Sequence, residues 1–369
     1  MFKNYPILKW SLIGIATLIL LLFGFGWWFM GLIPKHGDIA DRTQVQPNDL
    51  PYLTQNIPEN RGRVLAVVTS ATIMGKSGKP TGYELTELSR AYYVFKANGF
   101  MVDIASPKGG APQVVIDDED MGRFDFAFLN DRIAQYKVKN TIPVADIIPS
   151  NYEAVYFVGG KGAMFDFPEN KAIQHMVREL YQSNKVIGAV CHGPAALVNV
   201  LLDNGQHLLE DKTVSGFTNE EELLLIPEAK TIFPFLLQDE LVAQGAQFSE
   251  GAMYLEHISH ETNLVTGQNP WSTWKMAETM VREMGYSPKY RTLTGEENAM
   301  NVLMTYEAEG SQQAKALIER MYMEEELEME RILIAKHSLI AAMKGDIGRF
   351  VGLVGLTSYA KKMSKRRSS

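Results

Sequence analysis

The stretch Lys185–Leu201, KVIGAVCHGPAALVNVL, contains the only cysteine of the chain, Cys191. The residues before it, KVIGAV, form a short apolar run rich in β-branched residues, which predicts a buried strand. The residues PAALVNVLL that follow predict a helix with Pro194 in its first turn. Cys191 is therefore expected in a tight turn at the end of a strand, at the carboxyl edge of a sheet where ligands bind in open parallel sheets.

The rest of the chain repeats this alternation of strands and helices. Strands are predicted over residues 63–70, 100–107, 152–160, 185–190 and 263–267. Helices are predicted over residues 83–98, 170–184, 194–202 and 272–284. Residues 108–149 read as irregular chain with little sheet. Alternating strands and helices predict an α/β fold, with a mainly parallel sheet covered on both faces by helices.

Size, charge and cysteine count limit the classes of function that are open to the chain. The 369 residues fit one good-sized domain with appendages. The net charge of −7 and the lack of a basic, aromatic-rich stripe argue against nucleic acid as a partner. A single cysteine excludes an internal disulfide.

The segment from Trp10 to Ile33 is apolar and contains no charged residue. Its length is enough to cross a hydrocarbon layer of ~30 Å. A cleaved signal peptide is the competing interpretation. A signal peptide usually has an apolar core of ~7–15 residues followed by an A-x-A-like site. Here the apolar run is longer and no such site follows it. We therefore expect a single-pass transmembrane helix that anchors the chain in the lipid bilayer. The short N-terminal tail favours an N-inside topology with an extracytoplasmic catalytic domain, although the lysine and arginine bias is slight.

The expected organisation has five parts. These are a short N-terminal tail over residues 1–9, the transmembrane helix over 10–33, a linker over 34–61, the α/β domain over 62–285, and a helical C-terminal extension with a basic tail over 286–369. Residues 345–367 fit either a membrane-surface helix or a packing helix with a solvated tail. If the basic tail binds anionic inner-leaflet lipid, the catalytic domain is cytosolic, opposite to the favoured topology.

Two interpretations of Cys191 compete. Free cysteines are often buried and inert. A cysteine before a helix N-terminus instead lies next to the partial positive charge of the free N–H groups, and this charge stabilises the nucleophilic thiolate. The adjoining His-Gly-Pro and the strand–turn–helix context favour a nucleophile elbow.

The segment IGAVCHGPAAL resembles the elbow of the PfpI superfamily, the parkinsonism-associated deglycase family of the class I glutamine amidotransferase-like, flavodoxin-like fold. The similarity extends over residues 63–284 and is greatest to the branch of heat-shock chaperones and glyoxalase III enzymes. It leaves out the N-terminal segment and the C-terminal extension. The further matching segments are TGYELTELSRAYYVFKANGFMVDIASPKGG, VYFVGGKGAMFDFPEN, VSGFTNEEE and LVTGQNPWS.

The resemblance implies a catalytic set of Cys191, Glu87, His192 and Glu222. Glu87 corresponds to the acidic residue that faces the thiol, with Glu84 as the nearest alternative. His192 follows the nucleophile and can act as acid or base. Glu222 would orient it, although Glu220 and Glu221 lie beside it in the sequence.

The glycine turn Gly159, Gly160, Lys161, Gly162 follows a predicted strand and can present N–H groups to an oxyanion, together with the amide of His192. Many relatives have histidine where Lys161 stands; a lysine there favours an anionic substrate or simply points to solvent. His257 and His260 lack the H-x-E spacing of amidotransferases. With no convincing further ligands they suggest no metal site.

The resemblance implies a cofactor-free enzyme that converts small reactive carbonyls, such as methylglyoxal, to hydroxy acids through a Cys191 hemithioacetal. A redox sensor or holdase-type stress chaperone at the membrane is the alternative, and a cysteine peptidase ranks last. The sequence leaves the oligomeric state open, a homodimer included.

Overall fold

The computed structural model describes residues 6–33, 42–117 and 120–367. The chain divides into two compact units, an α/β unit over Arg42–Thr292 and a helical unit made of Met1–Asp41 and Leu293–Ser369. The first residues of the predicted N-terminal tail, 1–5, and the first part of the predicted linker, 34–41, lie outside the described residues.

The α/β unit is built on a seven-stranded sheet in the order β10-β11-β7-β6-β1-β3-β5. All neighbouring strands in it are parallel except β10 and β11. The strands are β1 (Arg63–Val67), β3 (Met101–Ser106), β5 (Ile142–Pro143), β6 (Ala154–Phe157), β7 (Val186–Val190), β10 (Ile258–Glu261) and β11 (Leu264–Gly267). Two short parallel pairs lie outside it: β2 (Tyr83–Glu84) with β4 (Val114–Val115), and β8 (Thr213–Val214) with β9 (Gln247–Phe248).

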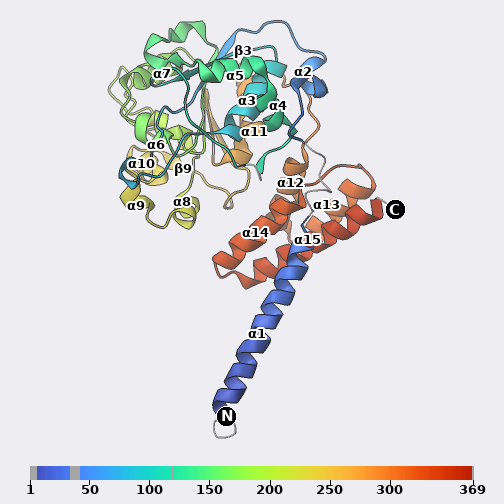
Figure 1. Cartoon of the computed structure of the whole chain (residues 1–369). Helices are drawn as coiled ribbons and strands as arrows, with labels where there is room; N and C mark the ends of the chain where they lie inside the picture. The colour runs from blue at the N-terminus through green and yellow to red at the C-terminus, as the bar shows by residue number, and fades with distance from the viewer. Residues whose placement is uncertain (1–5, 34–41, 118–119, 368–369) are drawn as a thin grey trace. The chain divides into compact units, whose positions relative to one another are not determined.

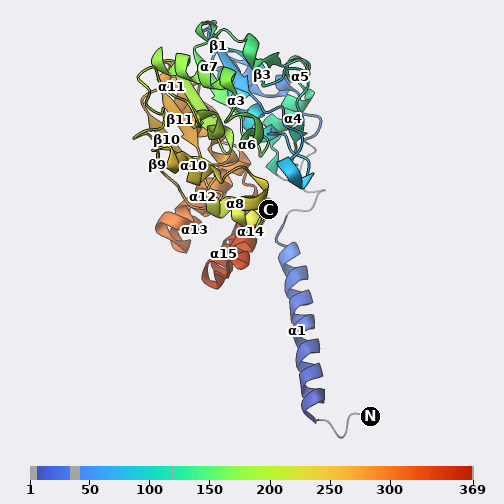
Figure 2. The same ribbon diagram turned by 90° about the vertical axis from the view of Figure 1, so that its left-hand side faces the viewer.

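Helices cover both faces of the sheet (Figures 1 and 2). The longer ones are α3 (Leu85–Ala97), α4 (Arg123–Asn130), α5 (Arg132–Lys139), α7 (Lys171–Gln182) and α11 (Thr273–Glu283). Shorter helices are α2 (Pro51–Thr54), α6 (Ala163–Asp166), α8 (Asn219–Leu225), α9 (Ala229–Ile232) and α10 (Leu237–Ala243). Helix α3 packs on α11, whereas α7 packs on β6 and β7. Right-handed crossovers explain this arrangement, because β1 to β3 and β6 to β7 advance in opposite directions along the sheet and so place α3 and α7 on opposite faces. The α/β prediction with a mainly parallel sheet is confirmed.

Two local predictions differ from the structure. Residues 108–149 contain α4 and α5, which are too short to show a sustained apolar period. The predicted helix over 194–202 is a 3₁₀ helix, η7, that ends at Leu197. It stops there because Val198 is extended and Asn199 has a left-handed backbone, with φ of 64°.

The α/β unit also includes chain on either side of residues 62–285. Tyr52 and Leu53 of α2 are buried in its core. After α11, the Arg291 guanidinium stacks 3.9 Å from the centre of the Trp274 ring. Residues 42–61 and 286–292 therefore belong to this unit.

The helical unit contains α1 (Pro6–Met30), α12 (Gly295–Glu309), α13 (Ser311–Met323), α14 (Arg331–Met343) and α15 (Ile347–Arg367). Helix α15 packs along α14 and α13. Its apolar residues Leu353 and Leu356 are buried within the unit. Of the two interpretations of residues 345–367, this arrangement matches the packing helix.

The prediction of a transmembrane helix over residues 10–33 is wrong. In the part of the chain that the structure describes, no helix combines the length and the apolarity that crossing a bilayer requires. Helix α1 ends at Met30, and Phe29 and Leu32, which the prediction assigned to lipid, are buried against Ala335 and Val354. The single-pass membrane localisation, the extracytoplasmic placement and the bilayer as a partner all depended on that helix and are withdrawn with it.

His337 on α14 makes the stability of the helical unit depend on pH. Burial lowers its pKa to about 3, and the charges of Arg349 and Lys336 act in the same direction. The unfolded chain takes up a proton on this imidazole below about pH 6.5, whereas the folded unit does not until about pH 3. Stability from this group is therefore complete above pH 6.5 and decreases as the pH falls towards 3, by up to about 2 kcal/mol at pH 5.

We expect His337→Leu to remove this part of the pH dependence. Hydrogen exchange of α14 peptides, corrected for intrinsic rates and followed from pH 7 to pH 5, measures it. Protection that decreases by the same amount in the wild type and the variant would contradict the prediction.

Candidate active site

Cys191 is held in a strained turn directly after β7. Its backbone is left-handed, with φ of 57°, an uncommon conformation for a residue other than glycine that is found preferentially at functional sites. Two backbone hydrogen bonds hold it there: the Cys191 N–H donates to the Gly267 carbonyl at 2.9 Å, and the Phe217 N–H donates to the Cys191 carbonyl at 2.8 Å. The end of β11 and the segment between β8 and α8 thus hold the turn that carries the thiol.

His192 connects the thiol to Glu222. Its Nδ1 lies 3.3 Å from Cys191 Sγ, and its Nε2 lies 2.5 Å from Glu222 Oε2. Cys191 and Glu222 are each 5% exposed and His192 is 1% exposed. Burial alone would raise the pKa of Glu222, but the charge and hydrogen bond of His192 lower it. The three side chains form a buried thiol–imidazole–carboxylate chain in which Glu222 can stabilise a protonated His192.

The structure gives the three neighbouring glutamates at the start of α8 different positions. Glu220 is exposed. The fully buried Glu221 caps the helix with Thr218 and accepts hydrogen bonds from Tyr254 N–H, Gln268 Nε2 and Asn269 Nδ2 at 2.7–3.0 Å. Glu221 therefore fixes the position of α8, and Glu222 is the one that reaches His192.

Glu87 faces the thiol from the first turn of α3. It is fully buried, and its Oε2 accepts a hydrogen bond from the Gly159 N–H at 2.6 Å. Burial raises its pKa well above the usual range, and the neighbouring Glu84 adds to this, while contacts with Cys191 and Gly159 oppose it. The raised pKa favours the protonated form of Glu87, so this carboxyl can donate a proton as well as accept one.

The thiol itself is not held as a thiolate. Burial raises the pKa of Cys191 well above its usual range, and the charge and hydrogen bond of Glu87 add to this effect. The sequence-based expectation of a thiolate stabilised by a helix N-terminus differs from this, because η7 is only a short 3₁₀ helix and burial dominates. A base must therefore remove the thiol proton at the moment of attack.

The glycine turn lies between Glu87 and the elbow. Only glycine fits at position 159, since a Cβ there would lie 2.6 Å from Glu87 Oε2, 2.7 Å from the Val190 carbonyl oxygen and 2.8 Å from His192 N. The Gly159 N–H is occupied by Glu87, whereas the Gly160 N–H is directed at the Cys191 sulfur. Gly160 is thus the N–H donor of the turn that lies at the nucleophile, and Gly162 packs against Thr69.

Glu84 and Lys161 complete the surroundings of the thiol. Burial raises the pKa of Glu84 to about 7, with Asp117 adding to the effect and Lys161 opposing it. The sequence suggests Glu84 only as an alternative to Glu87, yet the structure places both residues at this site. The role of Glu221 was missed, although the capping-box pattern T-x-x-E at residues 218–221 is a local signal that assigns Glu221 to the helix cap.

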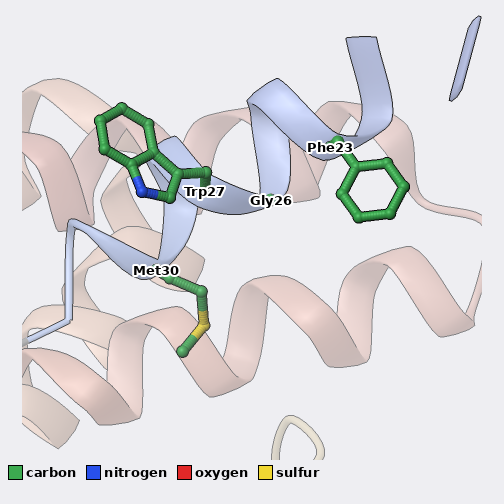
Figure 3. Close-up of a pocket in the computed structure, with 4 residues that line it drawn as sticks. All are labelled: Phe23, Gly26, Trp27 and Met30. Atoms are coloured by element: carbon green, nitrogen blue, oxygen red, sulfur yellow. The ribbon is translucent and has the colours of Figure 1, made fainter. Parts of the chain in front are cut away.

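His257 and His260 lie apart from this arrangement. His257 Nε2 lies 2.9 Å from Ser249 Oγ, and His260 Nε2 lies 3.0 Å from Glu283 Oε1. Among the residues that the structure describes, no group of three histidine, cysteine or acidic side chains is arranged to hold a metal ion. A hollow on α1, lined by Phe23, Gly26, Trp27 and Met30, belongs to the helical unit and contains no residue of the predicted site (Figure 3).

Glu222→Gln tests the geometry of the three glutamates. We expect kcat of the cysteine-dependent reaction to fall by about 10- to 100-fold, because a neutral amide cannot stabilise a protonated His192. Glu220→Gln, which removes the same charge from an exposed neighbour, is the matched control and should retain wild-type kcat. Steady-state kinetics of both variants measure the difference. Equal losses in the two variants would show that Glu222 has no particular role.

The chain is similar to a known protein family and to several curated relatives. The model of the DJ-1/PfpI family matches residues 79–283. A glutathione-independent glyoxalase of Schizosaccharomyces pombe is 30% identical over 214 residues, which cover 55% of this chain and 89% of the relative. Glyoxalase 3 of Candida albicans is 30% identical over 234 residues, which cover 59% of this chain and 96% of that protein.

Solved structures show the same similarity. The Rapid Encystment Protein 24 kDa of Francisella tularensis is 35% identical, with a TM-score of 0.57, and the match covers 60% of this chain and 99% of that one. The crystal structure of glyoxalase III from Candida albicans is 26% identical, with a TM-score of 0.55, and the match covers 61% and 98% of the two chains. Both matches extend over nearly the whole of the solved chain.

Proposed function

The chain belongs to the DJ-1/PfpI family, and from this premise we propose that it is a glutathione-independent enzyme of the glyoxalase III type. Its substrates are 2-oxoaldehydes such as methylglyoxal, and its products are 2-hydroxy acids. The observation that carries the proposal is the position of the Cys191 thiol, 3.3 Å from His192 Nδ1 and in contact with the Glu87 carboxyl. Named relatives that are glyoxalases support the choice of reaction.

In the first step, Cys191 adds to the aldehyde carbon. Because the pKa of the thiol is raised by burial, His192 Nδ1 removes its proton as the sulfur attacks, and Glu222 stabilises the imidazolium that forms. The protonated Glu87 donates its proton to the aldehyde oxygen. The product is a hemithioacetal, with one new C–S bond and a hydroxyl group in place of the aldehyde oxygen.

In the second step, the adduct rearranges without an external oxidant. Glu87, now a carboxylate, removes the proton from the carbon that carries sulfur and returns it to the neighbouring ketone carbon through an enediol, while the hydroxyl proton of the first carbon passes to the ketone oxygen. That transfer oxidises the first carbon to a thioester and reduces the second to an alcohol. The Gly160 N–H and the His192 amide are the candidate donors to the oxyanions of this sequence.

In the third step, the Glu87 carboxylate removes a proton from a water molecule as that water attacks the thioester, which releases the hydroxy acid and leaves Glu87 protonated again. His192 returns its proton to the sulfur, so that the enzyme regains its thiol. The sum of the steps is addition of one water to the 2-oxoaldehyde, and for methylglyoxal the product is lactate.

The buried thiol favours this reaction over the alternative functions. A redox-sensing cysteine needs a low pKa and solvent exposure, whereas Cys191 is 5% exposed and its pKa is raised by burial. A peptidase must admit a polypeptide chain to its nucleophile, and a thiol so little exposed suits a small substrate. A holdase function would appear as aggregation protection that survives Cys191→Ser.

The direct test uses the purified full chain with methylglyoxal in the absence of glutathione. We expect stoichiometric conversion to lactate, measured by chiral chromatography. Loss of methylglyoxal without lactate, or no loss above the protein-free rate, would refute the proposed reaction.

A further inference from the structure

We infer that Lys161 binds an anionic group of the substrate, so that the preferred 2-oxoaldehydes carry a carboxylate or phosphate on the carbon chain. This inference rests on the proposed function and specifies its substrate class. It starts from the turn after β6, whose four residues Gly159–Gly162 contain a single side chain, that of Lys161.

The turn is tightly held against the site. The Gly159 N–H donates to Glu87, and the Gly159 carbonyl accepts a hydrogen bond from the Glu84 N–H at 3.3 Å. A Cβ on Gly160 would lie 2.5 Å from the Gly82 carbonyl oxygen, so this part of the turn lies directly against the backbone that leads into α3. Contacts with Glu87 and with residues 82–84 therefore hold the backbone that carries Lys161 in place.

Among residues 6–33, 42–117 and 120–367, the Lys161 side chain has no partner for its charge. It is half-buried, and within the described part of the chain its ammonium takes part in no hydrogen bond and no ion pair. Lysines at structural positions usually pair with a carboxylate or extend into solvent. A half-buried, unpaired ammonium beside a nucleophile suits a negatively charged ligand.

The charge of Lys161 reaches the reacting groups. Burial raises the pKa of Cys191, and Lys161 is the first of the groups that oppose this rise. Lys161 also lowers the pKa of Glu84 against burial and Asp117, and it contributes with His192 to the lowered pKa of Glu222. The ammonium therefore lies near the nucleophile and near the carboxyl groups around it.

The carboxyl groups near Lys161 are partly protonated or already paired. Burial and the charge of Asp117 raise the pKa of Glu84 to about 7, so Glu84 is partly protonated at pH 7. Glu222 already pairs with His192. Asp117, which also lies near Glu84, is exposed. A substrate anion can therefore use the remaining positive charge of Lys161 while Cys191 attacks the aldehyde at the other end of the molecule.

The test compares two substrates of equal shape in the full chain. 4,5-Dioxopentanoate carries a carboxylate, and its amide, 4,5-dioxopentanamide, is neutral. Water adds to the first to give 2-hydroxyglutarate and to the second to give the corresponding amide. We expect the ratio of kcat/KM for the carboxylate over the amide to fall about tenfold in Lys161→Met. Lys171→Met, an exposed lysine on α7 with the same charge change, should leave the ratio at its wild-type value.

The outcomes separate this inference from the proposed function. If both substrates slow equally in Lys161→Met, the lysine acts on the charge of the reaction itself and the inference is overturned. If the wild type converts neither these compounds nor methylglyoxal, the proposed function fails instead. Binding of 2-hydroxyglutarate by calorimetry then still tests Lys161, because Lys161→Met should weaken it about tenfold. Unchanged binding would overturn the inference independently of turnover.

Discussion

Replacing Cys191 with serine is expected to reduce turnover of methylglyoxal by at least about 10³-fold, because a serine hydroxyl is a far weaker nucleophile than a thiol. His192 and Glu222 are arranged to remove the proton of a thiol whose pKa is raised by burial, and a hydroxyl is much less acidic still. A hydroxyl is smaller than a thiol and fits the same space, so the turn after β7 should be retained. Initial rates of lactate formation at saturating methylglyoxal measure the effect.

Cys191→Ala is the matched variant for this experiment. It removes the nucleophile and keeps the left-handed turn residue small, so both variants should be equally inactive. Thermal unfolding midpoints close to that of the wild type would show that neither loss is due to unfolding. A serine variant with wild-type kcat would rule out covalent catalysis by Cys191 and direct attention to another group.

Gly159→Ala is expected to destabilise the α/β unit by about 2–3 kcal/mol and to abolish activity. The added Cβ would lie 2.6–2.8 Å from one carboxylate oxygen and two backbone atoms. The Val190 carbonyl and the His192 amide belong to the elbow itself and cannot rotate away as a side chain can. The methyl group must therefore separate β6 from the elbow, or displace Glu87 from its hydrogen bond with Gly159. Urea unfolding followed by circular dichroism measures the stability change.

Gly216→Ala is the matched control for the overpacking argument. A Cβ at position 216 would lie 3.2 Å from a methyl group of Leu237 and 3.4 Å from the Cys191 carbonyl oxygen, and the leucine side chain can move. The expected loss is below about 1 kcal/mol. Equal unfolding midpoints for the two alanine variants would contradict the close approach described at Gly159.

Local sequence patterns were sufficient to predict the main strands and helices of the α/β unit. The predicted strand over residues 185–190 corresponds to β7, and the predicted helix over 272–284 corresponds to α11 within a residue at each end. Such elements are long, strongly apolar or clearly bounded by turn residues, so their signal lies within the sequence window itself. The eight-residue helices α4 and α5 lack that length, and they were missed.

The apolar composition of the N-terminal helix led to a wrong prediction. The apolar run over residues 10–33 predicted a membrane span, but Phe29 and Leu32 pack against Ala335 and Val354 from the far end of the chain. The hydrophobicity of this segment does not reveal that protein covers Phe29 and Leu32. That packing depends on residues more than 300 positions away, which no local window contains.

The sequence by itself determined the order of strands and helices, the turn that carries Cys191, and, through its resemblance to a known family, the residues to inspect around it. Only the tertiary structure decided the chemical state of those residues. Burial and the facing Glu87 raise the pKa of the Cys191 thiol, and the hydrogen bonds of Glu221 leave Glu222 to face His192. Solvent exclusion and contacts between distant segments set these properties, because the free energy of a charge depends on everything that surrounds it in space.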